Sequence, residues 1–155
     1  MEKIKSFTVN HLKLKSGLYI SRIDDFGKVI TTFDMRFTAP NLEPVMDTGS
    51  IHTLEHLGAT YFRNCPFKSS VVYFGPMGCR TGFYLILAGN YTPTDILPQV
   101  KEMLQFVIDF NGEIFGATPI ECGNYSDQNL NGAKEFANKY LNSLTNELCT
   151  EYPND

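Results

Sequence analysis

Residues 17–37, GLYISRIDDFGKVITTFDMRF, decide the fold class of this 155-residue chain. Two runs rich in β-branched and aromatic residues, 17–23 and 28–37, flank the short segment Asp24-Asp25-Phe26-Gly27. Glycine at the end of such a segment accepts the positive φ that a tight turn between strands requires. The stretch therefore predicts a β-hairpin.

Working outward, two more strand-like runs cover residues 70–74 and 81–88, joined by a tight connection over 75–80. Helical spacing of apolar residues predicts helices over about 50–64, after Thr94 and over about 132–144. Thr48 or Ser50 is expected to cap the first of these helices, and Pro98 is expected near the first turn of the second. Strands and helices that do not alternate strictly predict an α+β fold, with a four-stranded antiparallel sheet packed with helices.

The composition is typical of a globular protein, with 43% hydrophobic and 19% charged residues. A formal net charge of −4 excludes a basic nucleic-acid footprint and a polybasic membrane patch. No apolar run approaches the ~18 residues that span a bilayer, and the N-terminus lacks a secretory signal. We therefore expect a cytoplasmic protein with reduced cysteines. Without repeats or linkers, residues 1–155 are expected to form one domain.

Residues 52–56, His-Thr-Leu-Glu-His, form an H-x-x-E-H motif on the first predicted helix. His52 and His56 are about 40° apart and one turn along, close enough to share a metal ion. Glu55 lies about 60° from His52 on the other side, so its carboxylate borders the same ion and can act there as an acid or base. A helix that partly buries two histidines without a metal is the alternative, and it is disfavoured because the chain has only three histidines.

The same helix face continues toward the C-terminal end of the helix. Ala59 and Arg63 both fall within about 20° of His52, with Arg63 roughly 16 Å further along. Metal ligands, a small residue and a guanidinium therefore follow one another on one face. This arrangement predicts a groove for an elongated ligand that ends in a carboxylate.

The third metal ligand must come from elsewhere, because a catalytic tetrahedral site takes three protein ligands. Cys122 is the best candidate, since the following Gly123 permits close approach of the backbone. Two histidines and a cysteine favour a borderline or soft first-row ion over calcium or magnesium. Taken by itself, Cys122 is better explained as a buried structural thiol.

Cys79 is the other thiol of interest. It lies in a glycine-rich turn next to Arg80, two features that favour a thiolate, so it is a candidate base or nucleophile. His11, near the N-terminus, is by itself typical of a surface or hydrogen-bonded histidine. Arg36, at the end of a strand, is by itself typical of a solvated or ion-paired side chain.

Taken together, these segments resemble the LuxS family of S-ribosylhomocysteine lyases. The resemblance rests on HTLEHL from His52, PMGCRTGFY over 76–84 and ECGN over 121–124, with Ser6, His11 and the DMRF run over 34–37 before them. It covers essentially the whole chain, in order and at similar spacing.

The resemblance implies a cytoplasmic homodimer whose sheets face each other across the interface, with both active sites there. It implies cleavage of S-ribosylhomocysteine to homocysteine and 4,5-dihydroxy-2,3-pentanedione by carbonyl shifts and β-elimination. The second product is the precursor of autoinducer-2, used in quorum sensing, and the reaction belongs to the methyl cycle. One divalent metal per subunit is implied, iron(II) natively with zinc or cobalt able to replace it, and no organic cofactor.

Matched residue by residue, the resemblance also implies roles. It implies that His52, His56 and Cys122 bind the metal and that Cys79 and Glu55 transfer protons. It also implies that Ser6, His11 and Arg36 bind ribose from the neighbouring subunit. Arg63 would bind the homocysteine end of the substrate.

Four positions depart from the family pattern. Tyr73 stands where many members carry an acidic residue, Gly75 replaces a serine, Gln128 stands where a histidine often follows ECGN, and Gly58 replaces a common leucine. These changes concern substrate affinity rather than the metal ligands. Two other interpretations of the motifs are an H-x-x-E-H metallohydrolase, for which the chain is short, and a non-enzymatic fold with a closed structural metal site.

Overall fold

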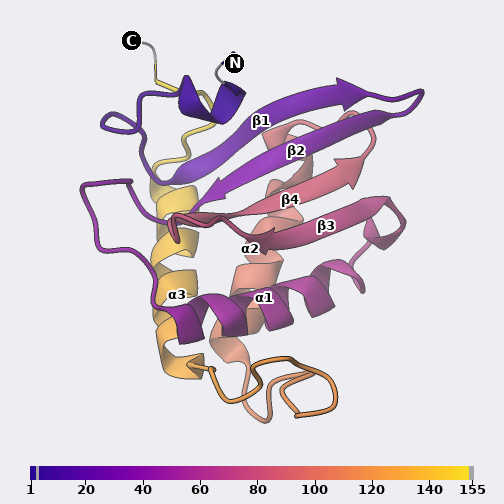
Figure 1. The fold of residues 1–155 in the computed structure, drawn as a ribbon, viewed down its shortest axis with the longest axis vertical. Helices are drawn as coiled ribbons and strands as arrows, with labels where there is room; N and C mark the ends of the chain where they lie inside the picture. The colour runs from indigo at the N-terminus through magenta and orange to yellow at the C-terminus, as the bar shows by residue number, and fades with distance from the viewer. Residues whose placement is uncertain (3, 154–155) are drawn as a thin grey trace.

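The computed structural model describes residues 1–2 and 4–153, and its strands follow the predicted hairpins closely. The elements, in chain order, are η1 (Lys5–Phe7), β1 (Gly17–Asp25), β2 (Val29–Arg36), α1 (Thr48–Phe62), η2 (Lys68–Ser70), β3 (Val71–Pro76), β4 (Gly82–Ala88), α2 (Pro93–Asp109) and α3 (Leu130–Asn146). Within the described residues this is the expected α+β fold, with one four-stranded sheet and three α-helices (Figure 1).

The sheet has the strand order β1-β2-β4-β3, and every neighbouring pair is antiparallel. The predicted turn between β1 and β2 is confirmed, because Gly27 has a φ of +81° and its N–H donates to Asp25 Oδ1 at 2.9 Å. Arg36 pairs with Gly82 at the start of β4. This register brings the end of β2 beside the turn that carries Cys79.

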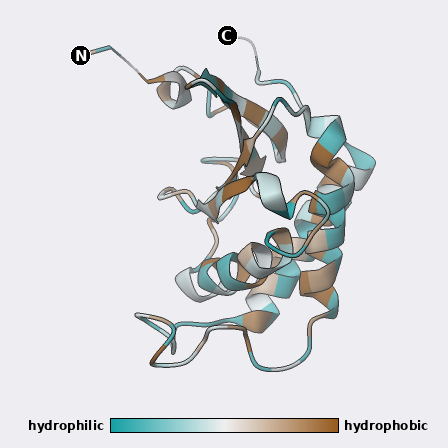
Figure 2. Ribbon diagram, turned by 90° about the vertical axis from the view of Figure 1, so that its right-hand side faces the viewer, coloured by the Kyte–Doolittle hydropathy of each residue, from teal (hydrophilic) through white to brown (hydrophobic). Residues whose placement is uncertain are grey.

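The two faces of the sheet differ. Phe83, Leu85 and Leu87 of β4 are buried in the hydrophobic core that the sheet shares with the three α-helices. Side chains alternate along a strand, so Tyr84 and Ile86 lie on the opposite face, where they are half-buried. Figure 2 shows the helices on one side of the sheet and the N-terminal segment on the other.

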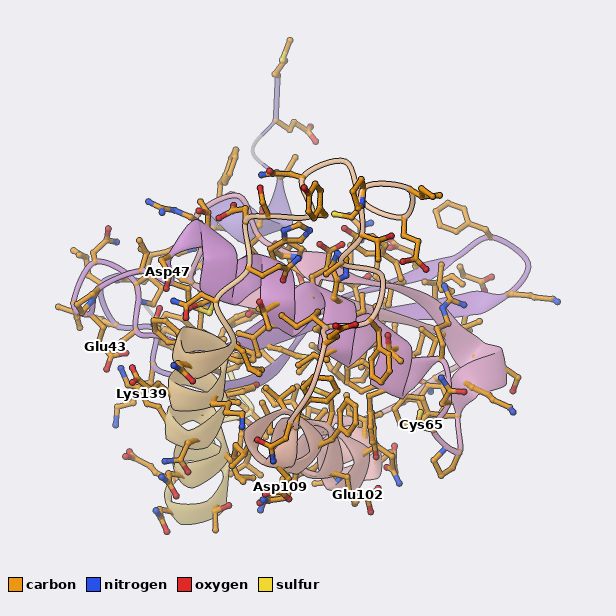
Figure 3. All side chains as sticks on the ribbon, turned by 90° about the horizontal axis from the view of Figure 1, so that it is seen from below. Glu43, Asp47, Cys65, Glu102, Asp109 and Lys139 are labelled. Carbon is orange, nitrogen blue, oxygen red and sulfur yellow. The ribbon has the colours of Figure 1, made fainter. Side chains whose placement is uncertain are left out.

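The N-cap of helix α1 lies one residue before Thr48, the nearer of the two expected caps. Asp47, not Thr48 or Ser50, is the N-cap, and its Oδ1 accepts from the Ser50 N–H at 2.9 Å. The Ser50 hydroxyl donates to Oδ2 of the same carboxylate at 2.6 Å. Three capping residues compete within positions 47–50, and the carboxylate offers two acceptor oxygens where a hydroxyl offers one. Figure 3 labels Asp47 at this end of α1 and Cys65 beyond the other end.

Helix α2 starts at Pro93, with Thr92 as N-cap in a capping box with Asp95. Pro98 was expected near the first turn, but it lies inside the helix, one turn further in. The first-turn proline is Pro93, whose missing N–H costs nothing at that position.

Candidate metal centre and thiol pocket

Helix α1 and the loop before α3 together form a group that could hold a metal ion. One ligand atom from each of His52, His56 and Cys122 lies within 4.8 Å of the others. His52 Nε2 is 3.0 Å from His56 Nε2 and 3.3 Å from Cys122 Sγ. The structure thus brings together the three residues that the sequence singled out. They are half-buried, so a small ligand can still reach the group.

Backbone carbonyls fix the two histidine rings from behind. His52 Nδ1 lies 2.9 Å from the Asp127 carbonyl oxygen, and His56 Nδ1 lies 2.6 Å from that of Phe115. A carbonyl only accepts, so each Nδ1 carries the proton and each Nε2 is left with a lone pair. Two such lone pairs cannot hydrogen-bond to each other across 3.0 Å. This donor set therefore fits a divalent cation of borderline softness. The two carbonyls that accept from Nδ1 are the kind of partner that orients metal-binding histidines.

The close approach behind His56 depends on Gly116. Its φ is +71°, and a Cβ at this position would lie 3.3 Å from His56 Nδ1. Behind His52, the Gln128 amide nitrogen lies 3.2 Å from Nδ1 without accepting its proton, and Gln128 Oε1 accepts from the Thr53 hydroxyl at 2.7 Å. Sequence reasoning did not identify these supporting groups, because two of the acceptors are main-chain carbonyls that any residue can supply.

Glu55 borders a surface cleft next to the metal group. The cleft is lined by Glu55, His56, Ala59, Thr60, Phe115 and Gly116. In the described part of the chain, the Glu55 carboxylate has no hydrogen-bond or ion-pair partner, and this leaves it available for proton transfer. Ala59 lies in this cleft as the helical face predicts.

Arg63 is not part of that cleft in the structure. Its guanidinium turns toward the start of β3 and donates to the carbonyls of Val71 at 2.7 Å and Val72 at 3.1 Å. The groove predicted from the helical positions therefore reaches Ala59, while the Arg63 side chain is occupied by backbone acceptors.

Cys79 lines a separate pocket of about 250 Å³ on the other face of the sheet. Its lining comprises Ser6, Phe7, Val9, His11, Leu14, Ser21, Asp34, Arg36, Met77, Gly78, Cys79, Tyr84 and Tyr152. Ser6, His11 and Arg36 were expected to reach the site from a neighbouring subunit, yet here they share the pocket of Cys79 in the same chain. None of the three metal ligands lines this pocket.

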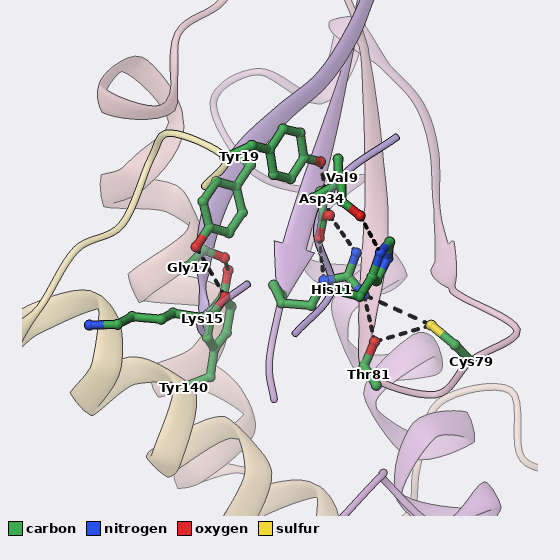
Figure 4. A network of polar contacts seen from close by, with 11 residues as sticks. Val9, His11, Lys15, Gly17, Tyr19, Asp34, Cys79, Thr81 and Tyr140 are labelled. Carbon is green, nitrogen blue, oxygen red and sulfur yellow. Dashed lines mark hydrogen bonds and ion pairs between the residues drawn. The ribbon is translucent and has the colours of Figure 1, made fainter. Parts of the chain in front are cut away.

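The Cys79 sulfur is exposed and contacts two polar groups (Figure 4). Sγ lies 3.1 Å from Thr81 Oγ1 and 3.9 Å from Arg36 Nη1. The sequence pointed to the adjacent Arg80 as the favourable charge, but the guanidinium that reaches the sulfur is that of Arg36. Arg80 instead has a φ of +61°, uncommon for a residue other than glycine, at the turn that exposes Cys79.

Arg36 is held rigidly although it lies on the face away from the helices. It is 4% exposed and pairs through Nε and Nη2 with both oxygens of Asp34, which is 2% exposed. Nη1 donates to Thr81 Oγ1 at 2.6 Å. Burial alone would lower the pKa of Arg36, but the Asp34 carboxylate outweighs it and the net shift is upward. The pocket thus keeps a fixed positive charge beside the thiol.

His11 contributes a ring whose orientation is set by its own turn. Nδ1 lies 2.8 Å from the Val9 carbonyl oxygen, so Nε2 is the nitrogen free to contact a ligand in the pocket. The sequence missed Asp34 and Tyr152 as members of this pocket, and it missed Thr81 as a contact of the Cys79 sulfur. Asp34 could have been found, since it precedes Arg36 by two residues and so shares its strand face.

The structure defines the class as a small α+β protein with a His-His-Cys group that could hold a metal ion and an exposed cysteine in a separate pocket. Comparison with known proteins then gives its family. Residues 4–151 match the model of the S-ribosylhomocysteinase (LuxS) family, and the chain belongs to that family.

Curated relatives agree with this assignment over nearly their full length. The S-ribosylhomocysteine lyase of Clostridium acetobutylicum is 58% identical over 148 residues, and that of Finegoldia magna is 56% identical over 147 residues, each covering 94% of both chains. The enzyme of the same name from Clostridium beijerinckii is 52% identical, covering 99% of this chain and all of the relative. Among the described residues, no helix is long and apolar enough to cross a membrane.

Proposed function

We propose that this chain cleaves S-ribosylhomocysteine to homocysteine and 4,5-dihydroxy-2,3-pentanedione, with one divalent metal ion per chain. The observation that carries the proposal is the His52, His56 and Cys122 group in a chain of the LuxS family. A thiolate in the donor set favours iron(II), zinc or cobalt over magnesium or calcium, and iron(II) is our first choice. Four free cysteines fit a reducing compartment, which we take to be the cytoplasm.

The proposed reaction removes protons from carbons next to a carbonyl. When bound, the metal would polarise that carbonyl as a Lewis acid. Cys79 removes and returns the proton as general base, a role worth about 10²–10⁴-fold in rate. Arg36 Nη1 and Thr81 Oγ1 contact its sulfur from one side. Glu55 moves the second proton from the metal side, where its carboxylate is unpaired among the described residues.

The remaining polar groups position the substrate. Ser6 and His11 face the Cys79 pocket and are proposed to bind ribose hydroxyls, together with Arg36. Arg63 is proposed to meet the homocysteine carboxylate. To do so it exchanges its two carbonyl acceptors on β3 for the two oxygens of the ligand.

We also propose a homodimer in which each active site combines two subunits. The thiol pocket of one chain contains none of the metal ligands, so a complete site needs a second source of one half. Among the described residues no α-helix packs on the sheet face that carries Tyr84 and Ile86, and its half-buried apolar residues can pack against a second sheet. In this arrangement, the metal group of one chain and Cys79 of the partner subunit form one active site.

Subunit exchange tests this arrangement directly. Cys79→Ala and His56→Ala homodimers are each expected to be inactive. Mixing them one to one gives half heterodimers, each with one intact and one doubly altered site, so activity is expected to recover to about a quarter of the wild type. If metal group and thiol served each other within one chain, no heterodimer site would be intact and activity would stay at zero.

Cobalt spectroscopy tests the ligand set separately. Cobalt(II)-loaded protein is expected to show sulfur-to-cobalt charge-transfer absorption. Cys122→Ser should abolish this band, while Cys79→Ala, which removes a thiol outside the group, should leave it unchanged. A band that survives in Cys122→Ser would contradict the assigned ligand.

A further inference from the structure

The C-terminal segment lies along the thiol pocket. The Cys149 carbonyl accepts from the Leu18 N–H at 2.9 Å and so ties this segment to the start of β1. Further on, the Tyr152 ring stacks on Tyr19, with centroids 4.9 Å apart and planes 11° from parallel. Tyr19 pairs with Asp34 across the β1-β2 register, so the stacked ring reaches the Asp34 side chain. Tyr152 is therefore part of the wall of the Cys79 pocket.

Tyr152 completes the hydrogen bonding of a buried carboxylate. Its hydroxyl donates to Asp34 Oδ2 at 2.9 Å, and both Asp34 oxygens also accept from Arg36. Burial, followed by the negative charge of Asp34, raises the pKa of Tyr152. The phenol therefore stays protonated and acts as donor. Asp34 is 2% exposed, so little solvent reaches it to replace a donor that is lost.

We propose that Tyr152 is a positioning residue of the thiol pocket, which acts on Cys79 through Asp34 and Arg36. Its hydroxyl and stacked ring fix the Asp34 carboxylate, and the two-point ion pair then fixes the Arg36 guanidinium. The third guanidinium nitrogen contacts both Thr81 Oγ1 and the Cys79 sulfur. In the described structure Tyr152 makes no hydrogen bond to the sulfur, and its effect passes through the buried pair.

Loss of the Tyr152 hydroxyl has two consequences with the same sign. One Asp34 oxygen loses a donor, so the buried pair gains freedom and Arg36 is held less firmly beside Cys79. The negative charge of Asp34 is also less compensated, and a negative charge near a thiol disfavours the thiolate. Both effects make Cys79 less effective in proton transfer, and they also loosen Arg36, which is proposed to bind ribose.

The test compares Tyr152→Phe with Tyr19→Phe. The two variants remove one hydroxyl each from the same stacked pair, but the Tyr19 hydroxyl donates to the Lys15 carbonyl at 3.0 Å and does not touch Asp34. The proposal rests on the role of Cys79 as proton-transfer group, so metal-loaded Cys79→Ala is assayed alongside. The second readout is the rate at which iodoacetamide alkylates Cys79, followed by mass spectrometry of its peptide. His11, Asp34, Arg36 and Tyr84 also face this pocket and are unaltered in both variants.

Tyr152→Phe is expected to lower kcat/KM about three- to tenfold. Alkylation of Cys79 should slow about threefold near neutral pH and should match the wild type at alkaline pH, where the thiol is ionised in both. Tyr19→Phe should change neither quantity. If Cys79 is alkylated at the wild-type rate in Tyr152→Phe, the proposal is overturned, whether or not kcat/KM falls. Full activity of Cys79→Ala would instead overturn the role of Cys79, so the two failures are distinguishable.

Discussion

Gly58 controls how closely α1, which carries His52 and His56, approaches the sheet. A Cβ at Gly58 would lie 2.5 Å from Phe74 Cε1 and 2.8 Å from Cζ, whereas ordinary contact begins at 3.4 Å. The Phe74 ring cannot move aside easily. It is 5% exposed and packs between Phe62, at a centroid distance of 5.1 Å, and Phe83, at 5.0 Å.

Gly58→Ala therefore sets two effects against each other. Alanine in a helix interior is favoured over glycine by about 1 kcal/mol. Relief of a contact that is about 1 Å too short costs about 1–3 kcal/mol, because α1 must move away from β3. We expect overpacking to win and the free energy of unfolding to fall by about 1 kcal/mol.

Urea unfolding of the metal-free protein measures this change as a lower midpoint at an unchanged slope. The matched control is Phe74→Leu, which removes the ring. In that background Gly58→Ala should become stabilising, by up to about 1 kcal/mol, because only the helix preference is left. A higher midpoint for Gly58→Ala in the native background would refute the reasoning.

Three further predictions concern α1 and the metal group. Gly116→Ala places a Cβ 3.3 Å from His56 Nδ1, at a φ of +71°. It should weaken binding of a divalent metal about tenfold, measured in competition with a chelating dye. Unchanged affinity would contradict the role of the Phe115 carbonyl. Asp47→Ala should lower the free energy of unfolding by about 1 kcal/mol at neutral pH. Burial opposes ionisation of Asp47, but hydrogen bonds from Ser50 outweigh it, so folding lowers the pKa of Asp47 below its ordinary 3.8. The stability from this cap is therefore present above pH 3.8 and is lost as pH falls through the folded-state pKa. If the urea midpoints of wild type and Asp47→Ala still differ equally well below that pH, the result counts against this cap. Removal of the metal by a chelator should lower Tm of the wild type but not of His56→Ala, and an equal drop in both would place the stabilising metal elsewhere.

The sequence predicted the fold because the signals for its elements are local. The β-branched and aromatic runs in 17–37 and the helical spacing after Thr94 gave the elements and their type. The predicted cap of α1 was wrong because Asp47, Thr48 and Ser50 lie within four positions and are all good capping residues. Choosing between them requires the backbone angles, and Asp47 has a ψ of 160° and so lies outside the helix.

The metal group could be predicted and the thiol pocket only in part, for a physical reason. His52 and His56 are one helical turn apart, so their proximity follows from local geometry. The contact of Arg36 with Cys79 instead depends on the strand register that sets Arg36 opposite Gly82, and register is a property of the whole sheet. Tyr152 reaches Asp34 from 118 positions away, and no local pattern signals such a contact.

The family resemblance linked residues that neither their spacing in the sequence nor the fold of one chain connects. It joined Cys79 to a metal group with which it shares no pocket within one chain. The structure adds that Ser6, His11 and Arg36 belong with Cys79 in the same chain, and this division is the basis for the proposed two-subunit site.

The most direct test is thiol release from S-ribosylhomocysteine under anaerobic conditions. Protein loaded with one iron(II) per chain is expected to release homocysteine, whereas Cys79→Ala is expected to hold the metal equally well and to release at least about a hundredfold less. No release by the metal-loaded wild type, or release at the wild-type rate by Cys79→Ala, would contradict the proposed division of work between the metal group and Cys79.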